Sequence, residues 1–290
     1  MLLLASKYVD IPACYPEWFF NRLSEGYFLK ENKKEKCYEK INLNPKDIDC
    51  IIFSTKNPQP IIPYLNQLNA MGYNYCFRFT LTPYGNDFDR NLGNKRNVLK
   101  TFENLCDLIG PERISWHYGP ILLNDKYTLE WHKKSFKQLL SRLCVNECNI
   151  SFDAIPCTSV YYELPDEFNM YKIADEFKEI AESKNVVLQN CSKSFKTPNV
   201  KTVGYIDYDK INKILPFNIS NDKNVIDCGE PFTCTNDCVY CKYNSIKCKY
   251  NNQENNQFSP LLVGIPDKSK KIKKIHIHSS VTDEQVSLFS

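Results

Sequence analysis

Three cysteines near the C-terminal end of the chain have a spacing that suits metal chemistry. Cys234, Cys238 and Cys241 follow the pattern Cys-x3-Cys-x2-Cys, and Tyr240 directly precedes the last of them. A loop with this spacing can wrap three thiolates around three corners of a [4Fe-4S] cube, which leaves one iron without a protein ligand. Because an open iron can hold a substrate or a cofactor, the spacing predicts redox or radical chemistry at this loop.

Zinc binding and structural thiols are two other interpretations of the same segment. A tetrahedral zinc site needs four ligands, and the segment offers Cys228, Cys234, Cys238, Cys241 and Cys248. Zinc ribbons usually pair two Cys-x2-Cys turns, and only Cys238 and Cys241 form such a turn here. The iron-sulfur interpretation is therefore favoured, with zinc or a disulfide cluster as alternatives and Cys228 as the candidate for a fourth ligand.

Length and composition indicate a folded protein with a large core. The chain has 290 residues, of which 42% are hydrophobic and 13% aromatic, enough for one large α/β domain or two smaller ones. No stretch is long enough to span a bilayer, and the apolar start of the chain is too short for an export signal. We therefore expect a cytoplasmic protein with no membrane partner, in which most of the 14 cysteines are reduced and buried. The net charge of +3 permits a nucleic-acid partner but does not require one.

Short apolar runs alternate with helical patterns along the first two thirds of the chain, as in parallel strands joined by crossover helices. The predicted strands are residues 2–5, 50–53, 76–80, 114–117, 150–152 and 186–189. The predicted helices are residues 16–25, 61–70, 96–109, 129–143 and 166–183. Six such units, without a Gly-x-Gly-x-x-Gly or Walker-type loop, favour an α/β fold built as a full or partial (β/α) TIM-like barrel.

Three parts of the chain are distinguished on this basis. Residues 1–191 form the predicted barrel core, and residues 192–227 form a polar connecting segment with a short helix around 208–214. Residues 228–290 hold the cysteine loop, a docking segment at 259–264, a lysine run at 268–274 that we expect to be solvated, and the C-terminal tail. We expect this last part to fold over the mouth of the barrel.

Polar residues that follow the predicted strands are the candidates for chemistry, because the loops after barrel strands converge on one open face. Asp10, Lys56 and His117 are the candidates for catalysis. The candidates for cofactor binding are Ser54, Thr55, Asn57, Thr80 and Asp153. The alternative is that these side chains have only a structural role. Asp, Asn, Ser and Thr in tight turns often bond only neighbouring backbone groups, and a buried histidine is more often structural than catalytic.

Seven segments of the chain match one family pattern. They are residues 10–13 (DIPA), 47–58 (DIDCIIFSTKNP), 77–85 (FRFTLTPYG), 121–128 (ILLNDKYT), the cysteine loop, 259–264 (SPLLVG) and 285–289 (QVSLF). As a set, they resemble a bacterial and archaeal family of unknown function, domain-of-unknown-function family 1848, and the resemblance runs nearly end to end. The family combines a barrel-like N-terminal region with a C-terminal Cys-x3-Cys-x2-Cys loop.

The cysteine loop is itself similar to that of the radical S-adenosylmethionine (SAM) superfamily. In that superfamily the open iron chelates the amino and carboxylate groups of SAM, and electron transfer from the cluster cleaves SAM to a carbon radical. The resemblance implies a [4Fe-4S] cluster on Cys234, Cys238 and Cys241, SAM as cofactor, a reductant such as flavodoxin or ferredoxin, and a substrate that the sequence does not identify. A likeness to spore photoproduct lyase, through the loop and the barrel, connects this chemistry with DNA lesions.

Three segments depart from the family pattern at charged positions. Lys7 and Tyr8 stand where the family has arginines, residues 116–120 read WHYGP in place of Trp-Arg-Tyr-Asp-Pro, and residues 228–230 read CGE in place of Cys-Gly-Cys. Loss of an arginine and an aspartate removes a bidentate anion clamp and a carboxylate. We therefore expect either a substrate that differs from that of the relatives or a loss of catalytic power.

The tail Gln285-Val286-Ser287-Leu288-Phe289 resembles the short motif by which bacterial DNA polymerases and repair proteins bind the sliding clamp. A few apolar side chains of a flexible tail can supply most of such a binding energy. The DNA sliding clamp is therefore an expected partner, and packing of the tail on an apolar patch of the protein itself is the alternative.

Two classes of function fit these observations. The first is a radical SAM-like enzyme with a [4Fe-4S] cluster, an unknown substrate and a connection to DNA lesions. The second is a non-catalytic binding protein in which a zinc or iron-sulfur site only staples the C-terminal segment to the barrel. We expect Cys228 and Cys248 to lie outside the site, because they fall outside the three-cysteine spacing.

Overall fold

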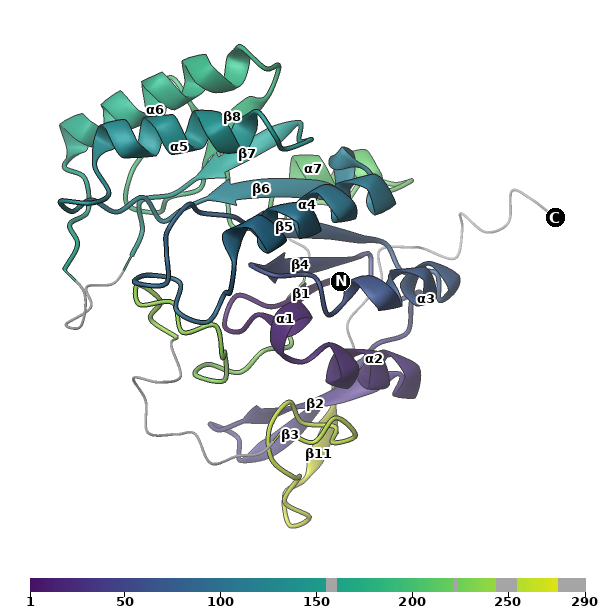
Figure 1. The fold of residues 1–290 in the computed structure, drawn as a ribbon. Helices are drawn as coiled ribbons and strands as arrows, with labels where there is room; N and C mark the ends of the chain where they lie inside the picture. The colour runs from purple at the N-terminus through teal and green to yellow at the C-terminus, as the bar shows by residue number, and fades with distance from the viewer. Residues whose placement is uncertain (155–160, 222–223, 244–254, 276–290) are drawn as a thin grey trace.

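Eight strands form the main sheet of the protein, and all of their pairings are parallel (Figure 1). Their order across the sheet is β10 (Val225–Asp227), β1 (Leu2–Ala5), β4 (Cys50–Thr55), β5 (Tyr75–Thr80), β6 (Ile114–Tyr118), β7 (Glu147–Ile150), β8 (Val187–Asn190) and β9 (Lys201–Thr202). The computed structural model describes residues 1–154, 161–221, 224–243 and 255–275.

The sheet is parallel and apolar on both faces, as expected for strands that are covered by helices. All four residues of β1 are buried, and so are five of the six residues of β4. Alternate residues of a strand point to opposite faces. Leu3 and Phe53 therefore pack in the main core, whereas Leu2 and Ile52 pack in a second, smaller core.

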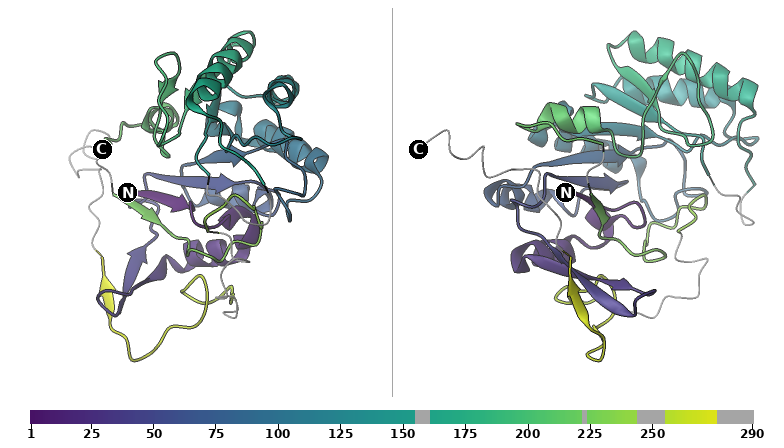
Figure 2. Two further views of the ribbon diagram at one scale, coloured as in Figure 1. Left: turned by 90° about the vertical axis from the view of Figure 1, so that its left-hand side faces the viewer. Right: turned by 180° about the vertical axis from the view of Figure 1, so that it is seen from behind.

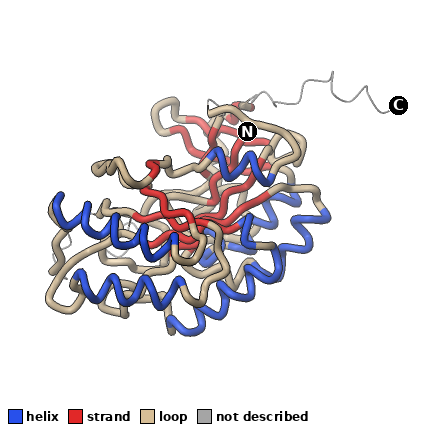
Figure 3. Tube along the Cα trace, turned by 90° about the horizontal axis from the view of Figure 1, so that it is seen from above, coloured by secondary structure: helices blue, strands red, loops and turns tan. Residues whose placement is uncertain are grey.

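Helices cover the two faces unequally (Figure 3). Within the described ranges, the main core receives side chains from α2 (Pro16–Glu25), α3 (Leu65–Ala70), α4 (Lys95–Ile109), α5 (Leu129–Leu140) and α6 (Glu167–Glu182). The opposite face is covered by α7 (Tyr208–Ile214), whose Ile211 packs with Leu2 and Leu4. Shorter turns are α1 (Ile11–Cys14), η1 (Ile62–Tyr64) and η2 (Pro111–Arg113). No helix among these combines the length and the apolar character needed to cross a bilayer.

Besides α1, which Asp10 caps, four helices of the described ranges begin where a polar side chain caps the first turn. The capping residues are Asn94 before α4, Thr128 before α5, Asp166 before α6 and Asp207 before α7, and each accepts a hydrogen bond from a backbone N–H of the helix. Such caps satisfy donors that have no partner inside the helix and typically stabilise it by about 1 kcal/mol. They therefore set where each crossover helix starts relative to the strand before it.

A second sheet of three strands lies beside the first (Figure 2). Its antiparallel hairpin consists of β2 (Tyr27–Asn32) and β3 (Cys37–Asn42), and β11 (Ile272–Lys274) pairs with β3 in parallel. The chain that leads to β11 is held by Trp18 of α2, whose Nε1 donates to the carbonyl oxygens of Ser259 and Leu261 at 3.0 and 2.9 Å. These contacts fasten the C-terminal part of the chain to the N-terminal helix.

Most elements predicted from the sequence are present. The structure confirms the bounds of β1, α2 and α7, and the ends of β4 to β6, β8 and α3 to α6 differ from the prediction by a few residues. The strand predicted at 150–152 was misplaced: β7 runs from Glu147 to Ile150 and shares only Ile150 with the prediction. The docking segment at 259–264 is also confirmed, since Ser259 and Leu262 are buried.

Five strands were absent from the prediction, namely β2, β3, β9, β10 and β11. Residues 192–227, expected as a connecting segment, supply β9 and β10 to the main sheet, and β10 extends it beyond β1. The lysine run is exposed as expected but forms β11, in which Lys273 pairs with Glu35. The α/β class is confirmed, whereas a complete TIM-like barrel would also need β9 to pair with β10, and within the described ranges these strands do not pair.

Candidate functional site

A cavity of about 560 Å³ lies at the carboxyl edge of the main sheet, where the loops after β1, β4, β5 and β6 meet the cysteine loop. Its wall on one side consists of Cys234, Cys238 and Cys241. Seven of the eight residues predicted to act in catalysis or cofactor binding also line it: Asp10, Ser54, Thr55, Lys56, Thr80, His117 and Asp153. The sheet therefore brings together most of the side chains that the strand-end argument selected.

The cysteine loop is attached to the segment between β5 and α4 by backbone hydrogen bonds. The N–H of Val239 donates to the carbonyl oxygen of Phe88 at 3.0 Å, and the N–H of Asn91 donates to that of Asn236 at 3.2 Å. The N–H of Cys241 donates to the carbonyl oxygen of Cys238 at 3.0 Å, which closes the turn between these two thiols. The positions of the thiols thus follow from the fold of the main sheet.

Asp89 is a fully buried carboxylate beneath this loop. Its Oδ1 accepts from Lys56 Nζ at 3.0 Å and from the Tyr240 hydroxyl at 2.6 Å. Its Oδ2 accepts from Lys95 Nζ at 2.5 Å and from Thr82 Oγ1 at 3.0 Å. One aspartate therefore joins the end of β4, the start of α4 and the aromatic residue of the cysteine loop.

The charges of this cluster determine the protonation of its members. Burial would raise the pKa of Asp89, but the charges of Lys56 and Lys95 hold it well below its usual range. Burial would lower the pKa of Lys56, and the carboxylate of Asp89 keeps it above its ordinary value. Two ammonium groups thus face one carboxylate, and the cluster carries one excess positive charge. Burial raises the pKa of the neighbouring Cys238 thiol, and the charge of Lys56 opposes this rise without cancelling it.

Asp10 joins three parts of the site. Its Oδ1 caps α1 by accepting from the N–H of Ala13 at 3.1 Å, and its Oδ2 accepts from the N–H of Lys56 at 2.8 Å and from Asn236 Nδ2 at 2.9 Å. Burial raises the pKa of Asp10 in spite of these hydrogen bonds. The carboxylate therefore ties β1, β4 and the cysteine loop to one another at the cavity wall.

His117 lies in the floor of the cavity with both ring nitrogens engaged. Its Nδ1 is 3.1 Å from Thr80 Oγ1, and its Nε2 is 3.0 Å from Ser151 Oγ. Burial, with smaller contributions from the charges of Arg78 and Lys56, lowers the pKa of His117 well below its ordinary value. The imidazole is consequently neutral near pH 7.

Ser54 and Asp153 lie on other parts of the same cavity. The Tyr205 hydroxyl donates to Ser54 Oγ at 2.8 Å, and Arg78 stacks on the Tyr205 ring at 4.6 Å from its centroid. Asp153 accepts from the N–H of Lys193 at 2.7 Å and from Ser194 Oγ at 2.6 Å. These hydrogen bonds of Asp153 thus connect the loop after β7 to the loop after β8.

Two of the predicted positions lie elsewhere. Asn57 turns away into a second cavity beside α4, where its Oδ1 accepts from the N–H of Gln59. Cys228 is buried in the main core, its N–H donates to the carbonyl oxygen of Leu4, and it does not line the cavity. Cys248 and residues 285–289 lie outside the described residues.

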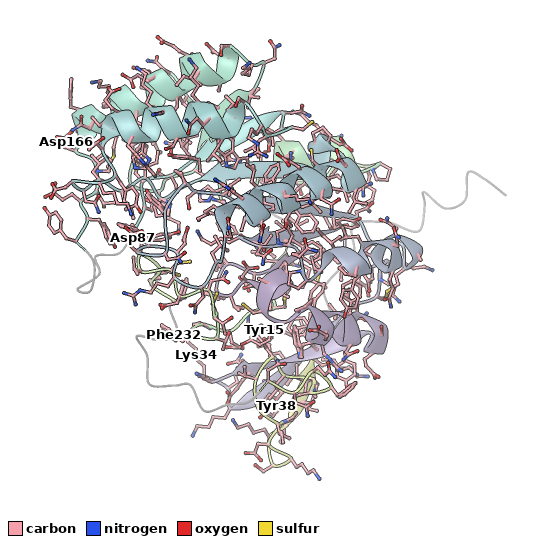
Figure 4. All side chains as sticks on the ribbon, viewed as in Figure 1. Tyr15, Lys34, Tyr38, Asp87, Asp166 and Phe232 are labelled. Atoms are coloured by element: carbon pink, nitrogen blue, oxygen red, sulfur yellow. The ribbon has the colours of Figure 1, made fainter. Side chains whose placement is uncertain are left out.

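The site also contains two residues that sequence reasoning missed, Asp89 and Cys14. Cys14, the last residue of α1, contacts Cys234, and the hydrogen bond between the two thiols raises the pKa of Cys234. Cys14 also lies 3.2 Å from Thr235 Oγ1, and the nearby Tyr15 hydroxyl, labelled in Figure 4, donates to the Thr233 carbonyl oxygen at 2.7 Å. A fourth thiol therefore reaches the cysteine loop from the start of the chain.

The arrangement of the thiols distinguishes the metal groups that it could hold. None of the twelve described cysteines forms a disulfide bond. Within the described ranges, no three His, Cys, Asp or Glu side chains gather around one point where a single ion could sit, as a zinc ion requires. The thiolates of a [4Fe-4S] cluster bind different iron atoms, so three cysteines that line one cavity without converging on one point are compatible with such a cluster.

The fold and the site define an α/β protein with a parallel sheet and a three-cysteine loop at the carboxyl edge of that sheet. The family described as a domain of unknown function (DUF1848) matches residues 2–243, so the chain belongs to this family. The match includes the cysteine loop and every strand of the main sheet. No curated protein matches the chain, and no solved structure matches it.

Proposed function

We propose that this protein is a radical SAM-type enzyme whose [4Fe-4S] cluster is bound by Cys234, Cys238 and Cys241. One observation carries the proposal: the three thiols, spaced as in the radical SAM loop, line a cavity of about 560 Å³, a volume within the usual range for small-molecule sites. In this proposal the parallel sheet is a partial barrel, and its carboxyl edge is the mouth in which SAM and the substrate bind.

A cluster bound at this loop would supply the electron that cleaves SAM to a carbon radical. The chain's own residues would bind and orient the reactants. The excess positive charge of the Asp89 cluster would offset the negative charge of the thiolates, because an opposite charge in a buried site is only weakly screened. Ser54 and Thr80 would present hydroxyl groups to polar parts of the cofactor or the substrate.

His117 and Lys56 would have different roles from a simple acid and base. Because burial keeps His117 neutral, it would act as a hydrogen-bonding and orienting group rather than as a cation. Lys56 remains charged through its contact with Asp89, so it would act as a fixed positive charge on the cavity wall. A reductant such as flavodoxin or ferredoxin would deliver the electron.

The less supported alternative is a non-catalytic binding protein in which a structural metal site only holds the cysteine loop against the sheet. The cysteine loop is already attached to the sheet by the Asp89 cluster, by Asp10 and by backbone hydrogen bonds. A metal is therefore not needed to hold the loop in place. The presence of an adjoining cavity lined by polar residues supports a ligand-binding role.

The test is anaerobic purification, or reconstitution with iron and sulfide, followed by visible absorption, iron and sulfide analysis, and electron paramagnetic resonance after reduction. We expect a brown protein with about four iron atoms per chain. Cys234→Ala, Cys238→Ala and Cys241→Ala should each lose the chromophore, whereas Cys228→Ala should keep it. Addition of SAM should change the resonance spectrum of the reduced protein.

The fourth thiol at the loop requires its own control. Cys14 contacts Cys234, and the proposal leaves it unligated, so Cys14→Ala should retain the chromophore and the response to SAM. If Cys14→Ala or Cys228→Ala destroyed the cluster, the site would have four protein ligands and no open iron. A colourless wild-type protein that binds one zinc ion would overturn the proposal altogether.

A further inference from the structure

Two lysines and two tyrosines form a basic aromatic rim at the mouth of the cavity. Lys7 and Tyr8 follow β1, Lys242 and Tyr243 follow the last cysteine, and all four line the cavity. The Tyr8 and Tyr243 rings meet edge to face with centroids 4.9 Å apart. Lys7 Nζ lies 5.0 Å from the Tyr8 centroid, and Lys242 Nζ lies 4.7 Å from the Tyr243 centroid.

A third lysine stands on a different part of the mouth. Lys193 follows β8, which is five strands away from β1 in the order of the sheet, and it also lines the cavity. The side chains of Lys7, Lys193 and Lys242 are exposed, and no carboxylate of the described part of the chain forms an ion pair with any of them. Cationic groups without counter-charges thus stand on two sides of the same opening.

The carboxylates of the cavity do not neutralise these lysines. Asp10 is occupied by Ala13, Lys56 and Asn236, and Asp153 is occupied by the loop after β8. The floor at His117 is neutral. Among the described residues, four lysines and two carboxylates line the cavity. A concave site with an excess of one sign of charge attracts ligands of the opposite sign, so the opening favours an anion.

We propose that this rim binds a nucleoside phosphate, with the phosphate between the lysines and the base against the Tyr8 and Tyr243 rings. Lysine ammonium groups bind phosphate as point charges, and aromatic side chains supply the stacking surface that nucleobases use in single-stranded complexes. A simple inorganic anion would leave the tyrosines without a role. As a statement about the substrate, this inference rests on the proposed function, but the binding itself can be measured without a cluster.

The phosphate can come from a free nucleotide or from a nucleic-acid strand, and the two sources are distinguished by the probes. Fluorescence anisotropy with a labelled single-stranded ten-nucleotide DNA measures binding of a strand, and isothermal titration with AMP and ATP measures binding of a nucleotide. Both are made on full-length protein purified in air without iron, and again on the reconstituted protein. Binding of either probe at micromolar concentration supports the inference.

The lysine variant and its control are matched in charge. The triple variant Lys7→Gln, Lys193→Gln, Lys242→Gln should weaken binding about tenfold or more and should lower the slope of log K against log salt by up to about 2 to 3 for a strand. The control triple variant Lys134→Gln, Lys137→Gln, Lys172→Gln removes the same charge from exposed positions on α5 and α6. It should bind as the wild type does.

The tyrosines are tested separately from the charges. Tyr8→Ala or Tyr243→Ala should weaken binding about tenfold, since loss of one stacked base contact has an effect of that order, whereas Tyr8→Phe should not. The inference is overturned if the wild type binds neither probe, or if the lysine and tyrosine variants bind as well as the wild type. A protein that binds the probes but never assembles a cluster would refute only the enzyme proposal.

Discussion

At the scale of single residues, Asp89 is the group that connects most of the candidate site. Its carboxylate has no exposed surface and bonds two lysines and the Tyr240 hydroxyl. Removing one partner of a buried ion pair leaves uncompensated charge, which typically costs about 3–5 kcal/mol. We therefore expect Asp89→Asn to lower the free energy of unfolding by about that amount in a urea titration.

The neighbouring Asp87 provides a matched control. Its ion pair with Lys126, at 2.9 Å, is more than one third exposed on both sides, and exposed pairs contribute at most about 1 kcal/mol. Asp87→Asn should therefore be close to the wild type in the same titration. Equal losses for the two variants would mean that Asp89 is no more important than a surface carboxylate.

Part of this residue-level picture could be predicted from the sequence. Cys234, Cys238 and Cys241 were recognisable because ligand spacing is a local property, and Lys56 and His117 because they end predicted strands. Asp89 has no such local signal. Its role comes from Tyr240, which is 151 residues away in the chain, and contacts at that separation depend on the tertiary fold.

At the scale of elements, α5 is anchored by a buried histidine that makes the protein sensitive to acid. His132 Nδ1 lies 2.8 Å from the Tyr118 hydroxyl of β6, and its Nε2 lies 2.9 Å from the carbonyl oxygen of Leu122. Burial lowers the pKa of His132 to about 4. Between that value and about 6.5 the unfolded chain binds more protons than the folded one, so stability falls as pH decreases through this range.

The size of this effect can be measured by chemical denaturation from pH 7 to pH 4. A shift of this extent corresponds to a loss on the order of 3 kcal/mol at the acid end. His132→Gln cannot titrate, so it should be less stable than the wild type at pH 7 but lose less stability on acidification. Parallel pH profiles for the two proteins would show that His132 does not control this loss.

The turn between β10 and the cysteine loop has no space for a side chain at Gly229. A Cβ at this position would lie 2.1 Å from Ser6 Oγ and 2.7 Å from Val9 Cγ1. Gly229→Ala should displace the start of the cysteine loop and cost about 1–3 kcal/mol, as overpacking generally does, and it should lower the iron content after reconstitution.

Gly204 is the comparison for this substitution. A Cβ there would lie 3.2 Å from the carbonyl oxygen of Ile206, a contact that small adjustments relieve. Gly204→Ala should therefore retain both stability and iron content. If Gly229→Ala retained them as well, the close packing of β10 against the loop after β1 would not matter for the site.

The elements that the sequence predicted differ from the missed ones in length and burial. β1 and β4 to β6 are mainly apolar runs that pair on both sides, and their pattern was sufficient, whereas β7 contains Glu147 and Asn149 and was misplaced. β9 and β11 have two and three residues, all exposed, so they carry no hydrophobic pattern. Their strand geometry comes from the partner strands β8 and β3, which the sequence alone does not identify.

At the scale of the whole molecule, the predicted core of residues 1–191 and the predicted connecting segment 192–227 are interdependent. The segment 192–227 supplies α7, which covers Leu2, Leu4 and Ile52 on one face of the sheet. A fragment of residues 1–191 would expose this second core. We therefore expect it to aggregate or to unfold without cooperativity, as measured by size-exclusion chromatography and thermal circular dichroism.

A longer fragment tests whether the segment after residue 191 is sufficient to restore folding. Residues 1–243 keep α7, β10 and the cysteine loop and end where the family match ends. This fragment should be folded and should unfold cooperatively, although it lacks the contacts of Trp18 with Ser259 and Leu261. A well-folded monomer from residues 1–191 would contradict the interdependence.

The pairing of β1 with β10 has a consequence for synthesis of the protein on the ribosome. β1 is synthesised before residues 225–227, which pair with its outer edge and lie more than 200 positions later in the chain. Until then the nascent chain presents an apolar strand with an open edge, which is a template for wrong pairing. Domains fold as they are synthesised, at about 5–20 residues per second, so this edge remains open for about 10 seconds or more. The edge of β1 is therefore open to wrong pairing until residues 225–227, which directly precede the cysteine loop, have been made.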